Sequence, residues 1–297
     1  MPRKSQTSRA WLRDLREALN SASQRVFAPQ ELRSFLDRER LRLAIPLSMG
    51  SAKLIGLLVQ EGVLHEVRLQ REGTTSTAST RTRFVVGNVS PYEVGLSLAR
   101  GGYLSHASAL FLNALTEQVP KTIYVNKEQT PKPRGRAVLT QPAIDRAFRG
   151  SSRTSQYVFV SSTSRYVLLS GKQTGRLEVS QVSGPSGELL EVTKLERTLV
   201  DVVVRPTYAG GVYELAKAYK AAASRTSVNT LLAVLKKLDY VYPYHQSIGF
   251  LMERAGFSEA QLRKVENLGI RWDFYLDYGM QESEYNARWH LHHPKGL

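Results

Sequence analysis

The sequence predicts an α+β protein, in which an N-terminal winged helix-turn-helix (residues 1–89) is followed by a mixed α/β domain (residues 90–297). Three helical patterns precede two extended runs before residue 87, which is the element order of a winged helix. Beyond residue 90, helical patterns alternate with short apolar runs typical of strands. The chain of 297 residues, 42% of them hydrophobic, is long enough for two domains with separate cores.

The first domain begins with an amphipathic helix and a short strand. Apolar residues at helical spacing predict a helix over Arg9–Asn20, and Arg25–Phe27 follows as a strand. Proline suits the first turn of a helix, so a second helix is expected to start at Pro29. The third helix is expected to run from about Ser48 to Glu61, where Gly62 is a typical terminator. Two strands, predicted at 64–69 and 83–87 and joined by a Gly/Ser/Thr-rich connection, complete the winged helix.

In a winged helix the third helix enters the major groove, so its face away from the core carries the candidate DNA contacts. Small hydroxyl side chains, an amide and a lysine on that face suit phosphate anchoring and modest base reading. Arginines of the predicted wing and basic residues at the chain start suit phosphates or a narrow minor groove. The resulting candidate DNA-binding residues are Ser48, Ser51, Lys53, Gln60, Arg68, Arg71, Arg81, Arg83, Arg3 and Lys4. The alternative is a winged helix that contacts only protein.

Charge also points to a polyanionic partner. The formal net charge is +15 and the pI is about 10.0, a balance typical of proteins that bind nucleic acid or an acidic surface. Residues 1–90 hold 15 Lys+Arg against 8 Asp+Glu, so the density of positive charge is highest in the first domain. The basic stretch between Lys127 and Ser155 is expected to be a surface loop, with a second nucleic-acid contact as the alternative.

The second domain is expected to start at Ser90, which with Glu93 forms a capping-box pattern. Helical patterns are predicted over 91–100, from 105, 141–148, 212–223, 229–238, 243–256 and 258–269. Strands are predicted at 122–126, 157–160, 165–170, 177–182, 189–192, 272–276 and 287–292. Gly171–Gly175 is interpreted as a hairpin turn between two of these strands, because it lacks the glycine and GK[ST] order of a phosphate-binding loop.

The stretch VTKLERTLVDVVVRPTYAGG (192–211) predicts a strongly apolar helix, in which Thr193 and Glu196 form a capping box. The helix is expected to end at Arg205, because a proline follows it. Arg197, Asp201 and Arg205 are spaced by four residues, which permits ion pairs along one side. On the residues alone, this stretch is a core helical hairpin with a solvated charged edge, or a ligand site.

The string VTKLERTLVD…RPTYAGG resembles the C-terminal domain of AbiEi-type antitoxins, the regulators of type IV toxin–antitoxin and abortive-infection systems. Three further stretches are similar to that family: GGYLSHASALFLNAL with its exit QVPKTIYVNKEQ, then YVYPYHQSIGFLMERAG, and the terminal PKGL. The resemblance covers roughly residues 91–297. It implies a winged-helix DNA-binding domain in front of an α/β antitoxin domain.

The function that the resemblance implies is that of a DNA-binding autorepressor and antitoxin. Its expected partners are double-stranded DNA of its own promoter, in the form of inverted repeats, and a nucleotidyltransferase toxin that need not form a direct complex with it. The expected antitoxin surface consists of Arg197, Asp201, Arg205, Tyr208, Gly210 and Gly211. Two alternatives stay open: a metal-dependent nuclease, and a scaffold whose winged helix does not read DNA.

No convincing active site, cofactor or metal site is found in the sequence, and no enzymatic activity is expected. His106 and His245 are expected to be structural, and the histidines at 290, 292 and 293 lack a further ligand. Glu188, Glu191 and Lys194 have the wrong spacing for a nuclease cluster. The absence of cysteine excludes disulfides and thiolate sites. Without a signal peptide pattern or an apolar run of ~20 residues, a cytoplasmic protein with no membrane partner is expected.

Overall fold

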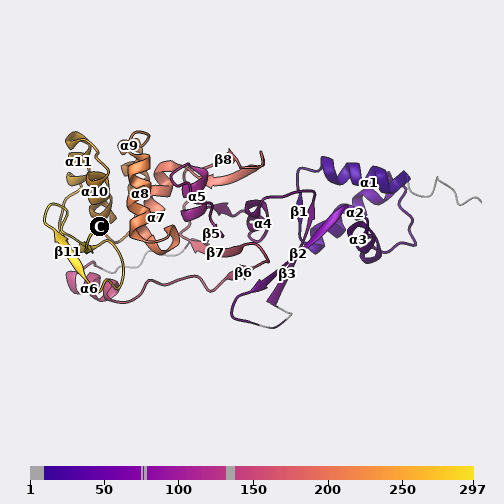
Figure 1. Cartoon of the computed structure of the whole chain (residues 1–297), viewed down its shortest axis with the longest axis horizontal. Helices are drawn as coiled ribbons and strands as arrows, with labels where there is room; N and C mark the ends of the chain where they lie inside the picture. Colours follow the sequence, from indigo (N-terminus) through magenta and orange to yellow (C-terminus); the bar gives the residue numbers. More distant parts are fainter. Residues whose placement is uncertain (1–9, 75, 77–78, 132–137) are drawn as a thin grey trace, which may run out of the picture.

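The computed structural model describes residues 10–74, 76, 79–131 and 138–297. The chain is a mixed α+β protein, as expected, and it is elongated: the first helices gather at one end and the last helices at the other (Figure 1). A nine-stranded mixed sheet with the order β1-β3-β2-β6-β7-β5-β4-β9-β8 joins the two ends. A second sheet, with the order β10-β12-β11, lies near the C-terminus.

The N-terminal elements follow the predicted order closely. They are α1 (Ala10–Ser21), β1 (Val26–Phe27), α2 (Pro29–Arg42), α3 (Ser51–Gln60), β2 (Leu64–Arg71) and β3 (Thr80–Val86). Their side chains form a core of their own, with Leu15, Leu19, Leu32 and Leu54 fully buried. The third helix is shorter than expected, because Gly50 is its N-cap and Ser48 lies in the preceding turn.

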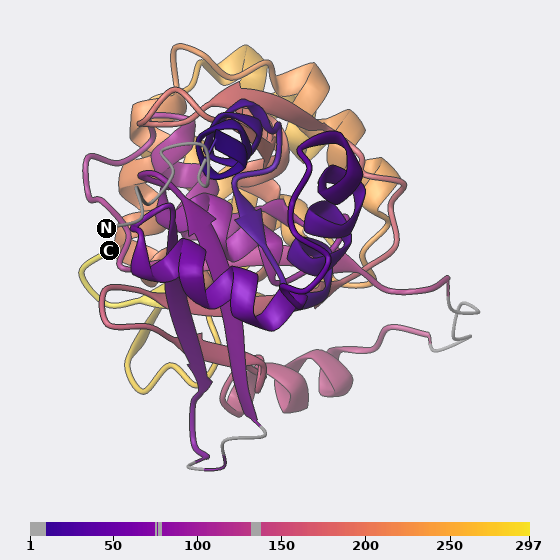
Figure 2. The same ribbon diagram turned by 90° about the vertical axis from the view of Figure 1, so that its right-hand side faces the viewer.

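The β2–β3 hairpin is long and belongs to both parts of the molecule. Its strands pair antiparallel from Leu64↔Val86 to Gln70↔Thr80, and Figure 2 shows them extending beyond the N-terminal helices. The distal end of β2 then pairs with β6, through Gln70↔Val160 and Arg71↔Phe159. The sheet is therefore continuous across the expected border at residue 89.

The middle of the chain supplies most of that sheet. Its elements are α4 (Pro91–Ser97), β4 (Tyr103–Leu104), α5 (His106–Leu112), β5 (Thr122–Glu128), α6 (Gln141–Arg149), β6 (Val158–Val160), β7 (Arg165–Gly171), β8 (Val179–Ser183) and β9 (Leu189–Thr193). The β4–β9 and β5–β7 pairs are parallel, and the other pairs in this sheet are antiparallel. The capping box of α4 is confirmed: Glu93 N donates to Ser90 Oγ, and Ser90 N donates to the Glu93 carboxylate.

The C-terminal part is a helical layer that buries the largest core of the protein. Its elements are α7 (Leu195–Val204), the 3-10 turn η3 (Pro206–Ala209), α8 (Val212–Ala222), α9 (Val228–Leu238), α10 (Tyr244–Arg254), α11 (Glu259–Glu266), β10 (Phe274–Tyr275), β11 (Ser283–Asn286) and β12 (Leu291–Pro294). Trp289 is fully buried, and it packs where Gly249 of α10 leaves room for the indole ring. The expected last strand is wrong at its start, because residues 287–290 form a turn.

Two local predictions are wrong. The stretch Gly171–Gly175 does not close a hairpin, because β7 and β8 lie at separate positions in the sheet. Instead, the Glu128 carboxylate accepts hydrogen bonds from the backbone N–H groups of Thr174, Gly175 and Arg176, which holds the connection in place. Thr193 does not cap α7 either: it ends β9, and its hydroxyl pairs with that of Thr198.

Candidate functional site

The outward face of α3 is the first candidate site. Lys53 and Gln60 are exposed on this helix, whereas Leu54 and Leu58 on the opposite face are buried. Ser51, at the start of the helix, donates from Oγ to Asp37 Oδ1 at 3.2 Å. Ser48 is exposed in the turn before the helix. Lys53 and Gln60 are therefore accessible on the outward face of α3, at the N-terminal end of the molecule, whereas Ser51 is half-buried and Ser48 lies before the helix.

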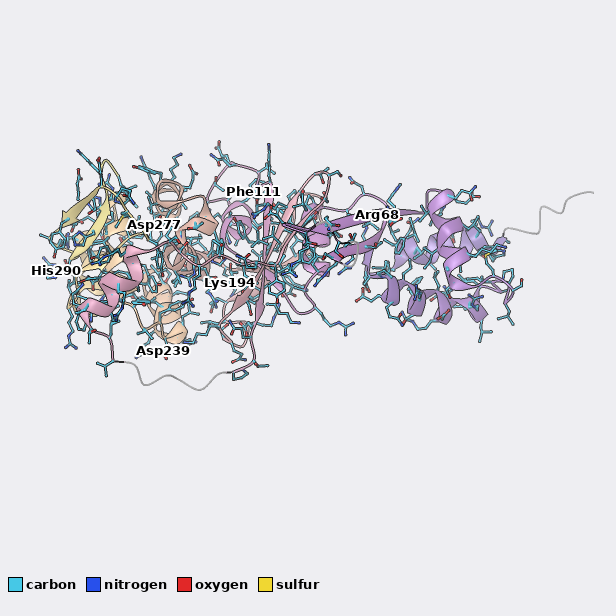
Figure 3. The ribbon with its side chains drawn as sticks, turned by 90° about the horizontal axis from the view of Figure 1, so that it is seen from below. Arg68, Phe111, Lys194, Asp239, Asp277 and His290 are labelled. Carbon is cyan, nitrogen blue, oxygen red and sulfur yellow. The ribbon has the colours of Figure 1, made fainter. Side chains whose placement is uncertain are left out.

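The hairpin arginines have different environments. Arg68 is exposed and pairs with Glu66, with Nε 2.7 Å from Oε1; Figure 3 places Arg68 toward the N-terminal end. The Arg71 guanidinium lies over the ring of Tyr157, 5.1 Å from its centroid. Both cations can reach an external anion only by leaving or sharing these contacts.

Two expected DNA contacts are engaged inside the protein. Arg83 is buried, with 8% of its surface exposed, and it donates to Ser97 Oγ and Ser97 O, each at 3.0 Å. Its assignment to DNA is therefore wrong, because its side chain fastens β3 to α4. Arg81 donates to Leu98 O at 3.1 Å and lies over the ring of Phe159. Arg3 and Lys4 lie outside the described residues.

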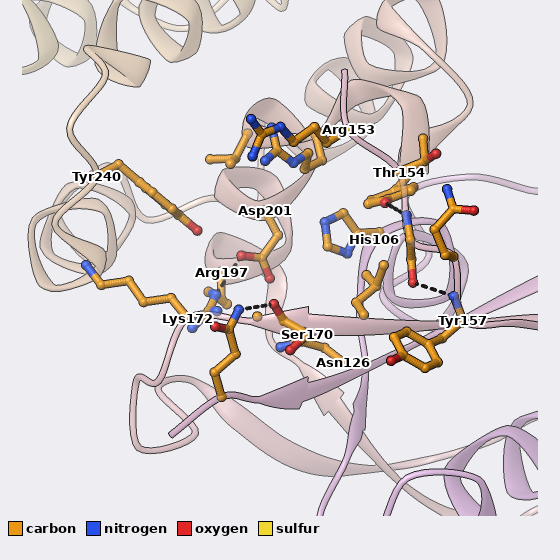
Figure 4. Close-up of a pocket in the computed structure, with 18 residues that line it drawn as sticks. His106, Asn126, Arg153, Thr154, Tyr157, Ser170, Lys172, Arg197, Asp201 and Tyr240 are labelled. Atoms are coloured by element: carbon orange, nitrogen blue, oxygen red, sulfur yellow. Dashed lines mark hydrogen bonds and ion pairs between the residues drawn. The ribbon is translucent and has the colours of Figure 1, made fainter. Parts of the chain in front are cut away.

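A cavity of 530 Å³ in the middle of the molecule is the second candidate site. Its walls come from α5, the ends of β5 and β7, the segment 153–157, α7 and η3 (Figure 4). Four of the six residues of the expected antitoxin surface line it, namely Arg197, Asp201, Arg205 and Tyr208. Several of these elements, such as α5 and α7, are far apart in the sequence, so the cavity exists only in the folded chain.

Arg197 and Asp201 form a buried ion pair at the base of this cavity. The Arg197 Nε lies 2.8 Å from Asp201 Oδ1, and the two residues are 4% and 6% exposed. Arg197 Nη1 also donates to Leu177 O at 3.1 Å. Burial raises the pKa of Asp201, and the guanidinium beside it opposes that shift. The expectation of a solvated charged edge is therefore wrong for this pair, because both side chains are buried at the cavity wall and are not exposed on the outer surface.

Arg205 is the third charge of this series and does not join the pair. Its Nη1 donates to the Tyr278 hydroxyl at 3.0 Å, and within the described part of the chain it has no ion-pair partner. The Tyr208 hydroxyl accepts a hydrogen bond from Ser155 N at 2.8 Å, which ties η3 to the segment 153–157. Gly210 and Gly211 both adopt positive φ, at 93° and 94°, where other residues are strained. They shape the turn into α8 and do not line the cavity.

His106 lies deep in the cavity wall. Its Nδ1 is 2.9 Å from Ser105 Oγ, and its ring meets that of Tyr208 edge-on, with 5.3 Å between centroids. Burial, together with the nearby cations of Arg197 and Arg205, lowers the pKa of His106 to about 3. The imidazole is therefore neutral at pH 7. Its φ of 52° is unusual for a side chain of this size.

A second cavity of 490 Å³ shares a wall with the first. The shared residues are Thr154, Ser155, Gln156 and Tyr208. Glu72 and Arg165 line the second cavity and form a two-point ion pair, with contacts of 3.0 and 2.8 Å. Since Glu72 directly follows β2, the hairpin is bonded to the rim of this second cavity.

Other residues with possible chemistry are engaged separately. Glu191 pairs with Arg176, Lys194 pairs with Glu178, and a Glu188 oxygen accepts from Ser186 N. These contacts do not bring the three together into a nuclease-like cluster. The described residues contain no group of three or more His, Asp or Glu side chains placed to hold a metal ion. His245 Nε2 bonds Gly269 O at 2.8 Å, and burial lowers the pKa of this imidazole.

The cavity residues that were not singled out in the sequence include Arg153, Lys172 and Tyr240. Arg153 belongs to the basic stretch 127–155, which gave only a general signal of positive charge. Lys172 belongs to the connection interpreted as a turn, and its Nζ donates to Leu238 O and Asp239 O. The sequence shows that both loops carry positive charge. That Arg153 and Lys172 lie at the same cavity follows only from the topology of the sheet.

No protein-family model matches this chain, and no curated protein matches it. The crystal structure of the Rv2827c protein from Mycobacterium tuberculosis is similar to it, with a TM-score of 0.58 over 95% of this chain and 91% of that one. The two sequences are 14% identical, so the similarity shows the fold alone. No helix among the described segments is both long and apolar enough to cross a bilayer.

Proposed function

We propose that this chain is a DNA-binding transcriptional autorepressor and the antitoxin of a type IV toxin–antitoxin system. In this proposal α1 to β3 act as a winged helix, α3 enters the major groove, and the β2–β3 hairpin is the wing. The observation that carries it is the exposed face of α3 with Lys53 and Gln60, at the free end of a chain with net charge +15. The target is the promoter of its own operon.

The organisation of the cavity supports the antitoxin half of the proposal. Three of the four stretches that resemble AbiEi-type antitoxins contribute to the wall of the central cavity, namely 101–129, 192–211 and 240–256, whereas the terminal PKGL does not line it. His106 and Asn126 come from the first of these stretches, Arg197 from the second and Tyr240 from the third. Since the stretches that resemble this family line one cavity, we expect the cavity to take part in the function that the resemblance implies. The functional partner would be a nucleotidyltransferase toxin.

The DNA-binding half is tested with DNA from directly upstream of the gene, by fluorescence anisotropy at fixed salt. The wild-type chain is expected to bind it more tightly than a scrambled duplex. Replacing Lys53 and Gln60 by alanine should weaken binding about tenfold or more, because each lost base or phosphate contact costs ~1–3 kcal/mol. The matched control is Arg263→Ala on α11, at the opposite end of the molecule. If the double variant and the control bind the upstream DNA with equal affinity, α3 does not contact DNA.

The antitoxin half is tested first by reading the neighbouring gene, which the proposal expects to encode a nucleotidyltransferase, and then by growth rescue in cells that express that enzyme. Wild-type protein should restore growth, whereas Arg205→Gln and Tyr208→Phe should restore it poorly while still melting near the wild-type temperature. Tyr213→Phe is the control, since Tyr213 is exposed on α8 and does not line the cavity. Failure of the wild-type protein to rescue would reject the antitoxin role. If both variants restore growth fully, Arg205 and Tyr208 have a structural role and the cavity is not the antitoxin surface.

A further inference from the structure

The central cavity carries an imbalance of charge. The described residues place four cationic side chains on its wall, Arg153, Lys172, Arg197 and Arg205, against the single carboxylate of Asp201. That carboxylate is already held by Arg197 at 2.8 Å. Three cations therefore face the cavity without a carboxylate from the cavity wall.

These three cations keep hydrogen-bonding capacity. Arg205 has five N–H donors, of which one goes to the Tyr278 hydroxyl. Lys172 has three donors and uses two of them on Leu238 O and Asp239 O. Arg153 is exposed and makes no hydrogen bond or ion pair with any described residue. The cavity thus holds unused donors on three side chains that come from three different segments.

We propose that this cavity binds a small molecule through a phosphate group. A carboxylate would supply one negative charge to three cations, whereas a phosphate supplies up to two and a pyrophosphate more. Phosphate oxygens also accept several charge-assisted hydrogen bonds at once, which suits donors that converge from separate segments. Since His106 is neutral at pH 7, its ring can accept or donate a hydrogen bond beside the anion without adding charge.

The size and position of the cavity favour a small molecule over a polymer. Its volume of 530 Å³ lies within the range of ~300–1,000 Å³ that is usual for small-molecule sites. Arg153 and Lys172 are exposed, so they lie where a ligand enters, whereas Arg205 is half-buried further along the wall. The aromatic rings of Tyr208 and Tyr240 provide a surface for the uncharged part of the ligand. This inference does not depend on DNA binding or on antitoxin activity.

The test is calorimetric titration of the full chain with pyrophosphate, with inorganic phosphate and acetate titrated at the same ionic strength. Pyrophosphate should bind saturably at one site per chain, inorganic phosphate more weakly and acetate not at all. The double variant Arg153→Gln/Lys172→Gln should weaken pyrophosphate binding about tenfold or more, the effect of losing ~1.4 kcal/mol of contact. Both positions are exposed, so the double variant should fold; a melting curve checks this.

The control double variant is Arg33→Gln/Lys237→Gln, which removes the same charge from exposed positions that do not line the cavity. It should bind pyrophosphate like the wild type. The proposal is overturned if pyrophosphate gives no saturable binding, or if the two double variants weaken it equally. It is also overturned if a 5′-phosphorylated oligonucleotide binds at the cavity while pyrophosphate does not, because the site would then serve nucleic acid. The titration contains no promoter DNA and no toxin, so either result leaves the proposed function untested.

Discussion

Arg197 and Asp201 lie one turn apart on α7 and form an ion pair from which solvent is almost fully excluded, with Nε 2.8 Å from Oδ1. Such a pair is difficult to replace on one side only, because the remaining charge stays buried without its partner. Asp201 also fixes the direction of the guanidinium at the base of the cavity. The pair thus connects the stability of the helical layer to the shape of the candidate site.

We expect Asp201→Ala to lower the free energy of unfolding by ~3–5 kcal/mol, because it leaves the Arg197 cation buried and unpaired. The control is Glu214→Ala on α8, which removes the partner of Lys217, a largely exposed side chain. That loss should stay below ~1 kcal/mol. Denaturant unfolding of the three proteins measures both effects. Similar losses for the two variants would contradict the burial of the α7 pair.

The pKa of His106, lowered to about 3, predicts that stability falls with acidity. In the unfolded chain a histidine titrates near pH ~6.5. As the pH drops below that value, the imidazole is protonated in the unfolded state, whereas in the folded state it stays neutral until about pH 3. This contribution to stability is therefore complete above about pH 6.5 and is lost progressively below it, with a limiting slope of ~1.4 kcal/mol per pH unit.

His106→Asn should remove that part of the pH dependence. Asparagine tolerates the positive φ at this position better than most residues do, so the backbone is kept. The measurement is the free energy of unfolding of both proteins between pH 7.5 and pH 5. The wild-type protein should lose more stability across this interval than the variant. Parallel curves would mean that the folded state takes up the His106 proton as readily as the unfolded state does, so that the pKa of His106 is not lowered by folding.

Arg68 and Arg83 should behave differently although they lie on the two strands of one hairpin. Arg68→Ala should leave thermal stability nearly unchanged, because Arg68 is exposed. If it contacts a phosphate, the slope of log K against log salt should become shallower by ~0.9. Arg83→Ala should instead destabilise the protein by ~1–3 kcal/mol, because it removes a buried side chain and leaves partly buried acceptors such as Ser97 O unpaired. If Arg83→Ala melts at the wild-type temperature, the hydrogen bonds of Arg83 to Ser97 do not stabilise the packing of β3 against α4.

Two helix glycines allow a matched test of packing. A Cβ added at Gly249 would overlap the ring of Trp289, a side chain with 0% exposure. Gly249→Ala should therefore destabilise the protein by ~1–3 kcal/mol or more, as overpacking of a filled core does. A Cβ at Gly56 of α3 meets nothing within 4 Å, so Gly56→Ala should stabilise the helix by ~0.5–1 kcal/mol. Thermal melts compare the two, and a neutral Gly249→Ala would show that the indole can move aside.

Helices and strands with clear periodicity could be predicted from the sequence, because the spacing of apolar residues reports directly on the face that is buried. The limits of α1, each within one residue, and the starts of α2 and β5 are examples. The burial of Arg197 and Asp201 could not be predicted, since a spacing of four residues suits an exposed pair and a buried pair equally. Which of the two forms depends on what packs against α7, and those neighbours come from other parts of the chain.

The candidate site shows the same limit. Arg205 and Tyr208 could be selected from the sequence, but Arg153 and Lys172 could not, because each lies in a loop with no periodic pattern. Arg83 was assigned to DNA because it belongs to a basic hairpin, yet its acceptors are on α4, 14 residues further along the chain. In both cases the missing information is which loops and strands the nine-stranded sheet places side by side.

The pairing of β2 with β6 has a consequence for any attempt to separate the N-terminal elements. A fragment that stops at residue 89 would lose the register partners Val160 and Phe159 and would uncover the backbone N–H and C=O groups at the distal end of β2. Uncovered strand edges recruit strands from other molecules. The isolated fragment should therefore self-associate as its concentration rises, whereas the full-length chain, in which β6 protects that edge, should not.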